Sequence, residues 1–173
     1  MASENRIKIW ESMEKYRTLL NPDDKHWDCL EIGTDGDPKP SGNFKYFGKG
    51  NNWKTMDNLV RLEPDIIADI SDWNSIPGES LGQIYDLIIC SQVLEHVYNF
   101  QNVIRNIFDL LKPGGHAIID CPFYFPYHGL EEYDDYWRIS EPAMIALLAE
   151  FGFEVVSCET LGPLTTALAR KSI

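Results

Sequence analysis

Positive charge is scarce in this sequence. Its 15 lysines and arginines stand against 27 aspartates and glutamates, which gives a formal net charge of −12. Because polyanions repel so acidic a chain, nucleic acid and anionic lipid surfaces are poor partners for it. Long apolar runs are also absent, and none approaches the roughly 18 residues that span a bilayer. Residues 1–5 show no basic stretch leading into an apolar one, so we expect a cytoplasmic protein without a membrane partner.

Closely paired cysteines are missing as well. Because no two cysteines have the spacing of a zinc site or a redox motif, we predict no metal site. We interpret the cysteines as buried thiols in a reducing compartment, with a reactive thiol at Cys121 as the alternative. Each cysteine lies in an apolar run: Cys29, Cys90, Cys121 and Cys158.

The chain has 173 residues, the size of one domain with one sizeable core. Apolar residues at helical spacing predict an N-terminal helix within residues 1–22, and residues 27–171 then form the α/β core. No internal repeat or low-complexity tract divides the sequence. We therefore expect a single domain over residues 1–173.

Short apolar runs alternate with helical patterns along the core. Asn99 and Ser140 stand where two helices are expected to begin, and Pro113-Gly114-Gly115 is expected to stop the first helix. Because strands that alternate with helices form a mostly parallel sheet covered on both faces, the pattern predicts an α/β fold. The expected strands are residues 27–32, 53–56, 66–70, 84–90, 117–121, 153–158 and 164–169, the last two forming an antiparallel pair.

Residues 39–54 form a local basic patch. Such a mixture of lysines and aromatic rings can bind single-stranded nucleic acid or a phosphorylated small molecule. Since the whole chain is acidic, we favour a solvated loop with its rings packed beneath it. The alternating residues are Lys39, Lys45, Lys49 and Lys54 with Phe44, Tyr46, Phe47 and Trp53.

The turn after the first core strand is acidic. Glu31, Asp35 and Asp37 surround Gly33 in it. Negative side chains there oppose the phosphates of NAD, FAD or ATP, which such sheets bind at a glycine-rich turn and helix N-terminus. They suit a ligand that lacks phosphate and carries positive charge. S-adenosylmethionine has an ammonium and a sulfonium against one carboxylate, so it meets this requirement.

Four segments give the chain a family resemblance. They are residues 94–97 (Leu-Glu-His-Val), 111–115 (Leu-Lys-Pro-Gly-Gly), 122–140 and 151–153 (Phe-Gly-Phe). On these segments the chain resembles the class I S-adenosylmethionine-dependent methyltransferases, in particular a compact type 11-like branch. The resemblance covers residues 27–171 and implies a Rossmann-like, mostly parallel seven-stranded sheet. The implied strand order is 3-2-1-4-5-7-6, with the last strand antiparallel.

The resemblance also implies a set of cofactor contacts. Asp35 and Asp37 stand where the family has its second and third loop glycines. Two alternatives stay open, namely Asp57 as a turn former and Asp69 as the cap of the next helix. The matching residues are Glu31 and Gly33 beside the methionine part, Asp57 at the ribose, Asp69 and Ile70 at the adenine, and Ser91 and Gln92 beside the sulfonium.

Aromatic residues crowd the loop after residue 122. His128 is the best candidate for a general base there, because imidazole titrates near neutral pH, and a structural loop histidine is the equal alternative. Glu95 and His96 are interpreted as structural residues. Aromatic faces can hold sugar rings and favour a nearby cation, or can simply pack on the sheet edge. The expected substrate contacts are Tyr127, Tyr133, Trp137 and Arg138, the last of which could instead pair with Asp134 or Asp135.

These observations predict an S-adenosylmethionine-dependent methyltransferase that acts on a small molecule and releases S-adenosylhomocysteine. A sugar or nucleotide-sugar hydroxyl is the favoured acceptor. A non-catalytic interaction module with the same fold is the first alternative. A nucleic-acid methyltransferase, which rests only on residues 39–54, is the second. Association of two copies into a homodimer that closes the pocket also stays open.

Overall fold

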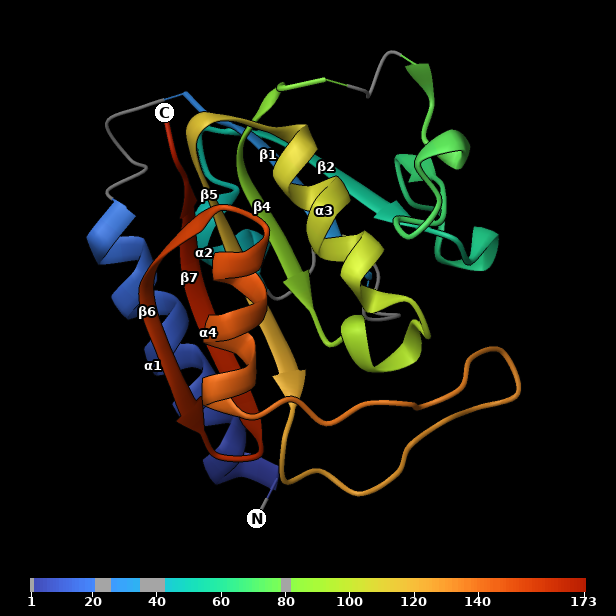
Figure 1. The fold of residues 1–173 in the computed structure, drawn as a ribbon, viewed down its shortest axis with the longest axis vertical. Helices are drawn as coiled ribbons and strands as arrows, with labels where there is room; N and C mark the ends of the chain where they lie inside the picture. The colour runs from blue at the N-terminus through green and yellow to red at the C-terminus, as the bar shows by residue number, and fades with distance from the viewer. Residues whose placement is uncertain (1, 21–25, 35–42, 79–81) are drawn as a thin grey trace.

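The computed structural model of the protein describes residues 2–20, 26–34, 43–78 and 82–173 (Figure 1). Asp35, Asp37 and Lys39 therefore lie outside the described residues. The strands are β1 (Asp28–Ile32), β2 (Asn52–Asp57), β3 (Ile66–Ile67), β4 (Tyr85–Ser91), β5 (Leu111–Pro122), β6 (Phe153–Leu161) and β7 (Leu164–Lys171). The α-helices of the described chain are α1 (Ala2–Leu20), α2 (Phe44–Phe47), α3 (Phe100–Leu110) and α4 (Glu141–Glu150).

All seven strands belong to one sheet of order β3-β2-β1-β4-β5-β7-β6. β1 is central and pairs in parallel with β2 and β4, and β5 pairs in parallel with β4. β7 runs antiparallel to both of its neighbours, β5 and β6. The predicted fold class and strand order are thus confirmed, including the antiparallel last strand.

Helices cover both faces of the sheet, as the pattern of apolar runs requires. Figure 1 looks onto the face covered by α3 and α4, with α1 on the far side. Under α3 and α4 lies a core that includes Ile104, Leu148 and Ile88. Met13 and Tyr16 of α1 help to form a second core on the opposite face. Burial of apolar surface on both faces is what favours this arrangement, because both sides of each central strand are apolar.

One expectation about α3 is confirmed and one needs correction. Asn99 lies at the N-cap position, but its side chain makes no capping hydrogen bond. The helix ends at Leu110, before Pro113-Gly114-Gly115, and these three residues belong to β5. The strand register shifts where β5 passes the start of β4. A Cβ on Gly115 would lie 3.1 Å from the carbonyl oxygen of Tyr85, so the glycine permits this bulge instead of stopping the helix.

The third strand is shorter than expected. It was predicted over residues 66–70 and spans only Ile66–Ile67. The side chain of Asp69 accepts hydrogen bonds from the backbone N–H and the hydroxyl of Ser71, each at 2.8 Å. An aspartate that bonds the backbone two residues ahead forms a turn, and this turn ends the strand.

A long loop, residues 123–140, leaves the carboxyl end of β5 and returns to α4 (Figure 1). At its start, the N–H groups of Phe123 and Tyr124 donate to the carbonyl oxygen of Pro163 in the β6–β7 turn. Near its end, the N–H of Tyr136 donates to the carbonyl oxygen of Glu95, 2.6 Å away. The loop is therefore tied to the sheet edge along its length, and we call it the β5–α4 loop.

Candidate active site

The carboxyl ends of β1, β4 and β5 lie side by side, which is where ligands bind in sheets of this kind. Gly33, directly after β1, has a φ of +78°, and a Cβ there would lie 2.3 Å from Cγ2 of Val93. Both the left-handed backbone and the contact with Val93 require glycine. Glu31, in β1, is buried and accepts a hydrogen bond from Nδ2 of Asn43 at 2.8 Å.

Asp57 ends β2 and faces the turn after β1. Its Oδ2 accepts hydrogen bonds from the N–H and the hydroxyl of Thr34, at 2.9 and 3.2 Å. Its Oδ1 accepts from the N–H of Leu59 at 2.8 Å. The turn-forming alternative and a ligand role coexist here, because two carboxylate oxygens have about four acceptor sites and these bonds leave one free.

The two residues expected at the adenine edge have other contacts. Asp69 holds Ser71, as described above, so it caps a turn. Ile70 is buried in the core, and its carbonyl oxygen accepts a hydrogen bond from Nδ2 of Asn106 at 2.7 Å. Both residues lie just beyond the carboxyl end of β3, but the side chain of Ile70 points into the protein core.

Ser91 and Gln92 both donate hydrogen bonds to Asp120, a buried acid that the sequence analysis did not single out. The Ser91 hydroxyl donates to Oδ2 of Asp120 at 2.7 Å, and the Gln92 N–H donates to Oδ1 at 3.2 Å. Gln92 has a φ of +54°, a conformation uncommon for a residue with a side chain. Burial raises the pKa of Asp120 to about 6, against the effect of the Ser91 and Gln92 hydrogen bonds. The sequence contained a signal for this residue, because Asp120 is an acid inside the apolar run of residues 117–121.

Glu95, His96 and His128 meet at this edge. His96 Nε2 and His128 Nε2 each lie 3.7 Å from Oε1 of Glu95, although the two histidines are far apart in the sequence. Glu95 follows β4 in a short 3-10 helix (Leu94–His96), and its side chain is fully buried. Burial raises the pKa of Glu95 to about 8, and nearby Asp120 and Asp135 raise it further. Burial also lowers the pKa of His96.

Arg138 shapes the β5–α4 loop from within. Its guanidinium binds both carboxylate oxygens of Asp135, and it also donates to the carbonyl oxygens of Phe125 and Pro126. The hydrogen bond from Arg138 lowers the pKa of Asp135. Asp135 in turn accepts a hydrogen bond from the N–H of His128 at 2.7 Å. Arg138 thus pairs with Asp135, which was the alternative to a substrate contact.

The aromatic residues of the loop divide into two groups. Trp137 Nε1 donates to the carbonyl oxygen of Val97, and its ring packs 5.3 Å from the Phe100 ring, so Trp137 holds the loop. The Tyr133 ring lies 4.3 Å from the imidazole of His96. Tyr127 is 71% exposed. Of the predicted substrate contacts, Trp137 and Arg138 therefore hold the loop, whereas Tyr127 is exposed and Tyr133 lies against His96.

Comparison with known proteins fits this geometry. The sequence profile of a family described as a methyltransferase domain matches residues 5–158. The chain belongs to this family. Its membership confirms the resemblance to class I S-adenosylmethionine-dependent methyltransferases on which the predicted strand order depended.

Individual relatives share less of the sequence. The ubiquinone biosynthesis O-methyltransferase of Acinetobacter baylyi is 36% identical over 66 residues, which make up 35% of this chain and 27% of that protein. The chain thus spans about a quarter of the length of this curated relative. This relative locates the similarity within one part of the methyltransferase domain.

Solved structures of other proteins share this fold over nearly the whole chain. A 1,6-didemethyltoxoflavin-N1-methyltransferase from Burkholderia thailandensis, with S-adenosylhomocysteine bound, has a TM-score of 0.68 at 16% identity and covers 95% of this chain and 81% of its own. An S-adenosylmethionine-dependent methyltransferase from Mesorhizobium loti has a TM-score of 0.67 at 13% identity, covering 95% and 98%. At such low identity these structures establish the fold.

The described residues of the methyltransferase domain suit S-adenosylmethionine. Asp57 keeps room for a hydroxyl donor, and Glu31 places a second acid at the end of β1. Acids at these positions favour hydroxyl and ammonium groups over phosphates. S-adenosylmethionine is the cofactor of the family, and its demethylated product, S-adenosylhomocysteine, is bound in the Burkholderia relative.

Residues 43–54 of the basic patch form α2 and the start of β2, so the expectation of a loop here is wrong. Phe47 is buried, and the rings of Phe44 and Trp53 meet edge to face at 5.7 Å. The ammonium of Lys45 lies 5.4 Å from the centre of the Tyr46 ring. The rings are thus used in packing, as the favoured interpretation expected, and this argues against a nucleic-acid surface.

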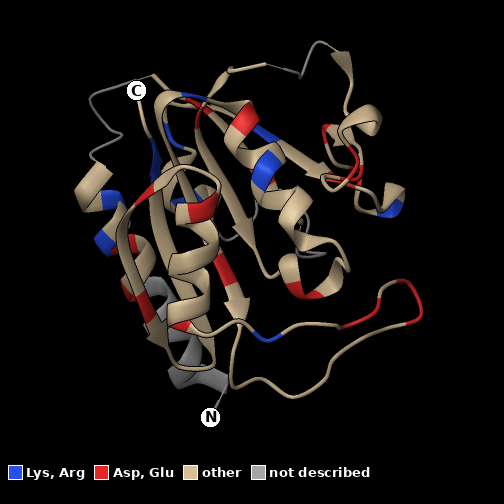
Figure 2. Ribbon diagram, viewed as in Figure 1, with Lys and Arg blue, Asp and Glu red and all other residues tan. Residues whose placement is uncertain are grey.

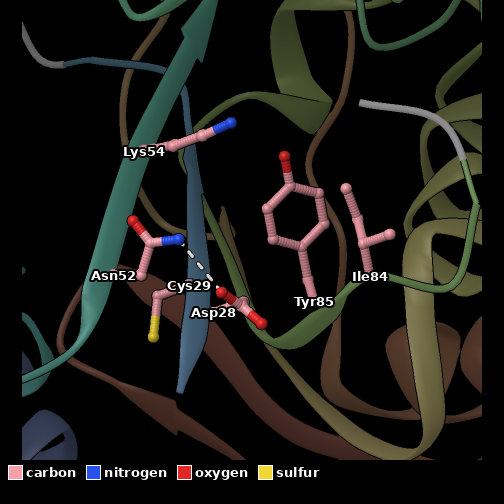
Figure 3. Close-up of a pocket in the computed structure, with 6 residues that line it drawn as sticks. All are labelled: Asp28, Cys29, Asn52, Lys54, Ile84 and Tyr85. Carbon is pink, nitrogen blue, oxygen red and sulfur yellow. Dashed lines mark hydrogen bonds between the residues drawn. The ribbon is translucent and has the colours of Figure 1, made fainter. Parts of the chain in front are cut away.

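A pocket lies at the opposite end of the strands. Figure 3 shows it beside the starts of β1, β2 and β4, with Asn52 donating to Asp28 at 3.0 Å. Lys112 also binds Asp28, at 2.9 Å, and Asp86, at 2.7 Å. Ligands of such sheets bind at the other, carboxyl edge, so this polar cluster is a structural ion-pair network. In the part of the chain that the structure describes, no helix combines the length and apolar character needed to cross a membrane.

Proposed function

We propose that this methyltransferase transfers the methyl group of S-adenosylmethionine to a hydroxyl group of a small molecule, with a sugar as the favoured acceptor. The observation that carries the proposal is the position of two imidazoles beside a buried acid. Glu95, His96 and His128 lie at the carboxyl edge of the sheet, just after the Ser91–Gln92 turn that the family resemblance places beside the sulfonium. Groups that accept protons at this point serve an oxygen nucleophile, which must lose its proton on methylation.

The acidic loop tip selects among acceptors. Figure 2 shows acidic residues along the tip of the β5–α4 loop. They are Glu131, Glu132, Asp134 and Asp135. Arg61 and Arg138 are paired with two of these acids, Glu132 and Asp135. The phosphates of a nucleotide sugar would meet uncompensated negative charge, so a neutral or cationic sugar is favoured over a nucleotide sugar.

The loop offers a surface for such a ring. Tyr124 and Tyr127 are both more than 70% exposed, at 72% and 71%. Exposed aromatic faces are suited to the apolar face of a sugar. His128 is the residue that we propose takes up the acceptor proton, since its imidazole follows these tyrosines in the same loop and lies 3.7 Å from the buried Glu95.

Calorimetric titration with S-adenosylmethionine and S-adenosylhomocysteine tests cofactor binding. We expect micromolar binding to the unmodified chain and its loss in Asp57→Ala. Asp109→Ala, an exposed acid near the end of α3, is the matched control and should bind normally. Absence of binding to the unmodified chain would favour the non-catalytic module.

A methyl-transfer assay over neutral, amino and nucleotide sugars then tests the acceptor. We expect turnover with neutral or amino sugars and its loss in His128→Ala. Turnover restricted to nucleotide sugars, or unaffected by His128→Ala, would contradict the assignment of the acceptor or of the base, respectively.

A further inference from the structure

The two histidines of the cluster present the same ring nitrogen to Glu95. Nδ1 of His96 lies 2.6 Å from the carbonyl oxygen of Asp134. A carbonyl oxygen only accepts hydrogen bonds, so Nδ1 carries the proton of the neutral ring. Nε2 of His96 therefore presents a lone pair to Oε1 of Glu95.

The same reasoning applies to His128. Its Nδ1 lies 3.1 Å from Oδ2 of Asp135 and 3.3 Å from the carbonyl oxygen of Pro126. Both of these atoms accept hydrogen bonds, so Nδ1 again carries the proton. Nε2 of His128 is then a second lone pair directed at Glu95.

Glu95 completes a group of three electron-pair donors. Its side chain is 0% exposed, and neither carboxylate oxygen has a hydrogen-bond partner among the described residues. One ligand atom each from Glu95, His96 and His128 lies within 4.8 Å of the others. A buried acid that keeps its charge without a partner costs several kcal/mol or more, so Glu95 holds either a proton or a bound cation.

The separations suit a metal ion better than a shared proton. A proton would need nitrogen and oxygen within about 3.2 Å of each other, and both histidines are 3.7 Å from Oε1. Ligands that lie about 2.0–2.2 Å from one Zn²⁺ ion are roughly 3.3–3.6 Å apart in a tetrahedral site. The separations from Oε1 are slightly wider than that, so both imidazoles would move toward Glu95 when the ion binds.

The geometry points to a divalent transition-metal site formed by Glu95, His96 and His128. Two imidazoles and one carboxylate favour Zn²⁺ and its neighbours over Mg²⁺ or Ca²⁺, which prefer oxygen ligands. Three protein ligands leave a fourth position open, as in sites where zinc acts on a substrate. Both imidazoles are partly exposed, which leaves that position accessible from the loop side.

The surrounding residues match those that support metal-bound histidines. Such histidines donate their other N–H to a carboxylate or a carbonyl oxygen, which fixes the orientation of the ring. Asp135 supplies the carboxylate for His128, and the backbone of Asp134 supplies the carbonyl for His96. Arg138 holds Asp135 in place through both oxygens. Asp135 and Arg138 are thus positioning residues for the proposed site.

This inference rests on the proposed function for its chemical role and refines it. A cation in the site binds the oxygen of the acceptor hydroxyl and lowers its pKa. The O–H bond then breaks, the electron pair stays on oxygen, and the proton passes to water. His128 in that case acts as a ligand of the metal, and the metal replaces it as the group that activates the acceptor.

Metal binding is tested directly on the full chain after treatment with a chelator. We expect one Zn²⁺ or Co²⁺ ion per chain by calorimetry and elemental analysis. Glu95→Gln, His96→Asn and His128→Asn should each weaken binding by about 100-fold or more, and Asp135→Asn by about 10–100-fold. His26→Asn, an exposed histidine before β1, is the matched control and should bind like the unmodified chain.

Magnetic resonance of the unmodified chain keeps the inference testable if a variant fails to fold. Added Zn²⁺ should shift the Nε2 nitrogen resonances of His96 and His128 and leave those of His26 and His116 in place. No shift, or a stoichiometric ion that the three variants do not affect, would overturn the inference. Titration with S-adenosylhomocysteine on the same samples separates the two proposals. Cofactor binding and turnover in metal-free protein would remove the metal site and leave the proposed function standing.

Discussion

Arg61, after β2, forms a bidentate ion pair with Glu132 at the tip of the β5–α4 loop. Nε of Arg61 lies 2.8 Å from Oε1 of Glu132, and Nη2 contacts Oε2. The pair joins segments 71 positions apart in the sequence. It brings the loop from the end of β5 across the carboxyl edge to the neighbourhood of Asp57, so the loop bridges the predicted acceptor and cofactor positions.

Exchange of the two charges tests this bridge. Arg61→Glu and Glu132→Arg should each raise the KM for the acceptor several-fold, and the double variant should restore it. Stability should change by less than about 1 kcal/mol, because both side chains are exposed and water screens the pair. Steady-state kinetics and denaturant unfolding measure the two effects. A double variant no better than the single variants would show that the pair does not position the loop.

Gly33→Ala should destabilise the protein for two separable reasons. Gly33 and Gly50 have similar φ values, +78° and +82°, but a Cβ on Gly50 has nothing within 4 Å. Gly50→Ala therefore measures backbone strain alone, about 1–3 kcal/mol. Gly33→Ala should cost about 1–3 kcal/mol more, because its new methyl group overlaps Val93.

Denaturant unfolding of Gly33→Ala, Val93→Ala and the double variant completes this test. The added cost in Gly33→Ala should shrink when Val93 is truncated. Equal losses for Gly33→Ala and Gly50→Ala would mean that the contact with Val93 is relieved at no cost.

Stability should fall as pH rises through the titration of Asp120. Its pKa is raised from the ordinary 3.8 to about 6 in the folded protein, first by burial. Between these values the folded state keeps a proton that the unfolded state has released. This contribution therefore declines from about pH 4 to pH 6 and is constant above, by about 3 kcal/mol in total.

Asp120→Asn isolates that effect, since asparagine does not titrate. The unfolding free energy of the unmodified protein minus that of Asp120→Asn should decrease over this range, while the other acids cancel. A difference that does not change with pH would show that Asp120 keeps its ordinary pKa in the folded protein, and one that increases with pH would show a lowered pKa.

Thiol labelling distinguishes the two interpretations of Cys121. All four cysteines are free, and Cys158 alone among them is only partly buried. Burial raises the pKa of the Cys121 thiol and also that of Cys158, the latter to about 11. We expect Cys158 to react first at pH 8 and Cys121 only as the protein unfolds. Mass spectrometry of partly labelled protein checks the order, and early modification at Cys121 would support a reactive thiol.

The fold followed from the sequence because apolar periodicity reports burial directly. The runs at residues 84–90 and 117–121 became the central strands β4 and β5. Predictions failed where a local hydrogen bond or a bulge decided the outcome. Asp69 ends β3 through Ser71, and the glycines at 114–115 accommodate a register shift. Neither effect produces a periodic pattern of apolar residues in the sequence.

The candidate site was only partly predictable, because its contacts join distant segments. Glu95 and His96 were interpreted as structural, since nothing local shows that His128 reaches them. Asp120 was hidden within an apolar strand. Trp137 and Arg138 were expected to meet substrate, but their polar groups are used to hold the loop. Residue type indicated the region, and tertiary contacts show which of its side chains are already bonded within the protein.

The close approach of Gly33 and Val93 has a mechanical consequence. Val93 immediately precedes the short helix that carries Glu95 and His96. A Cβ at position 33 would overlap the valine methyl group, so any residue other than glycine there pushes on the segment that leads into this helix. The glycine after β1 thus sets how closely the two turns can pack.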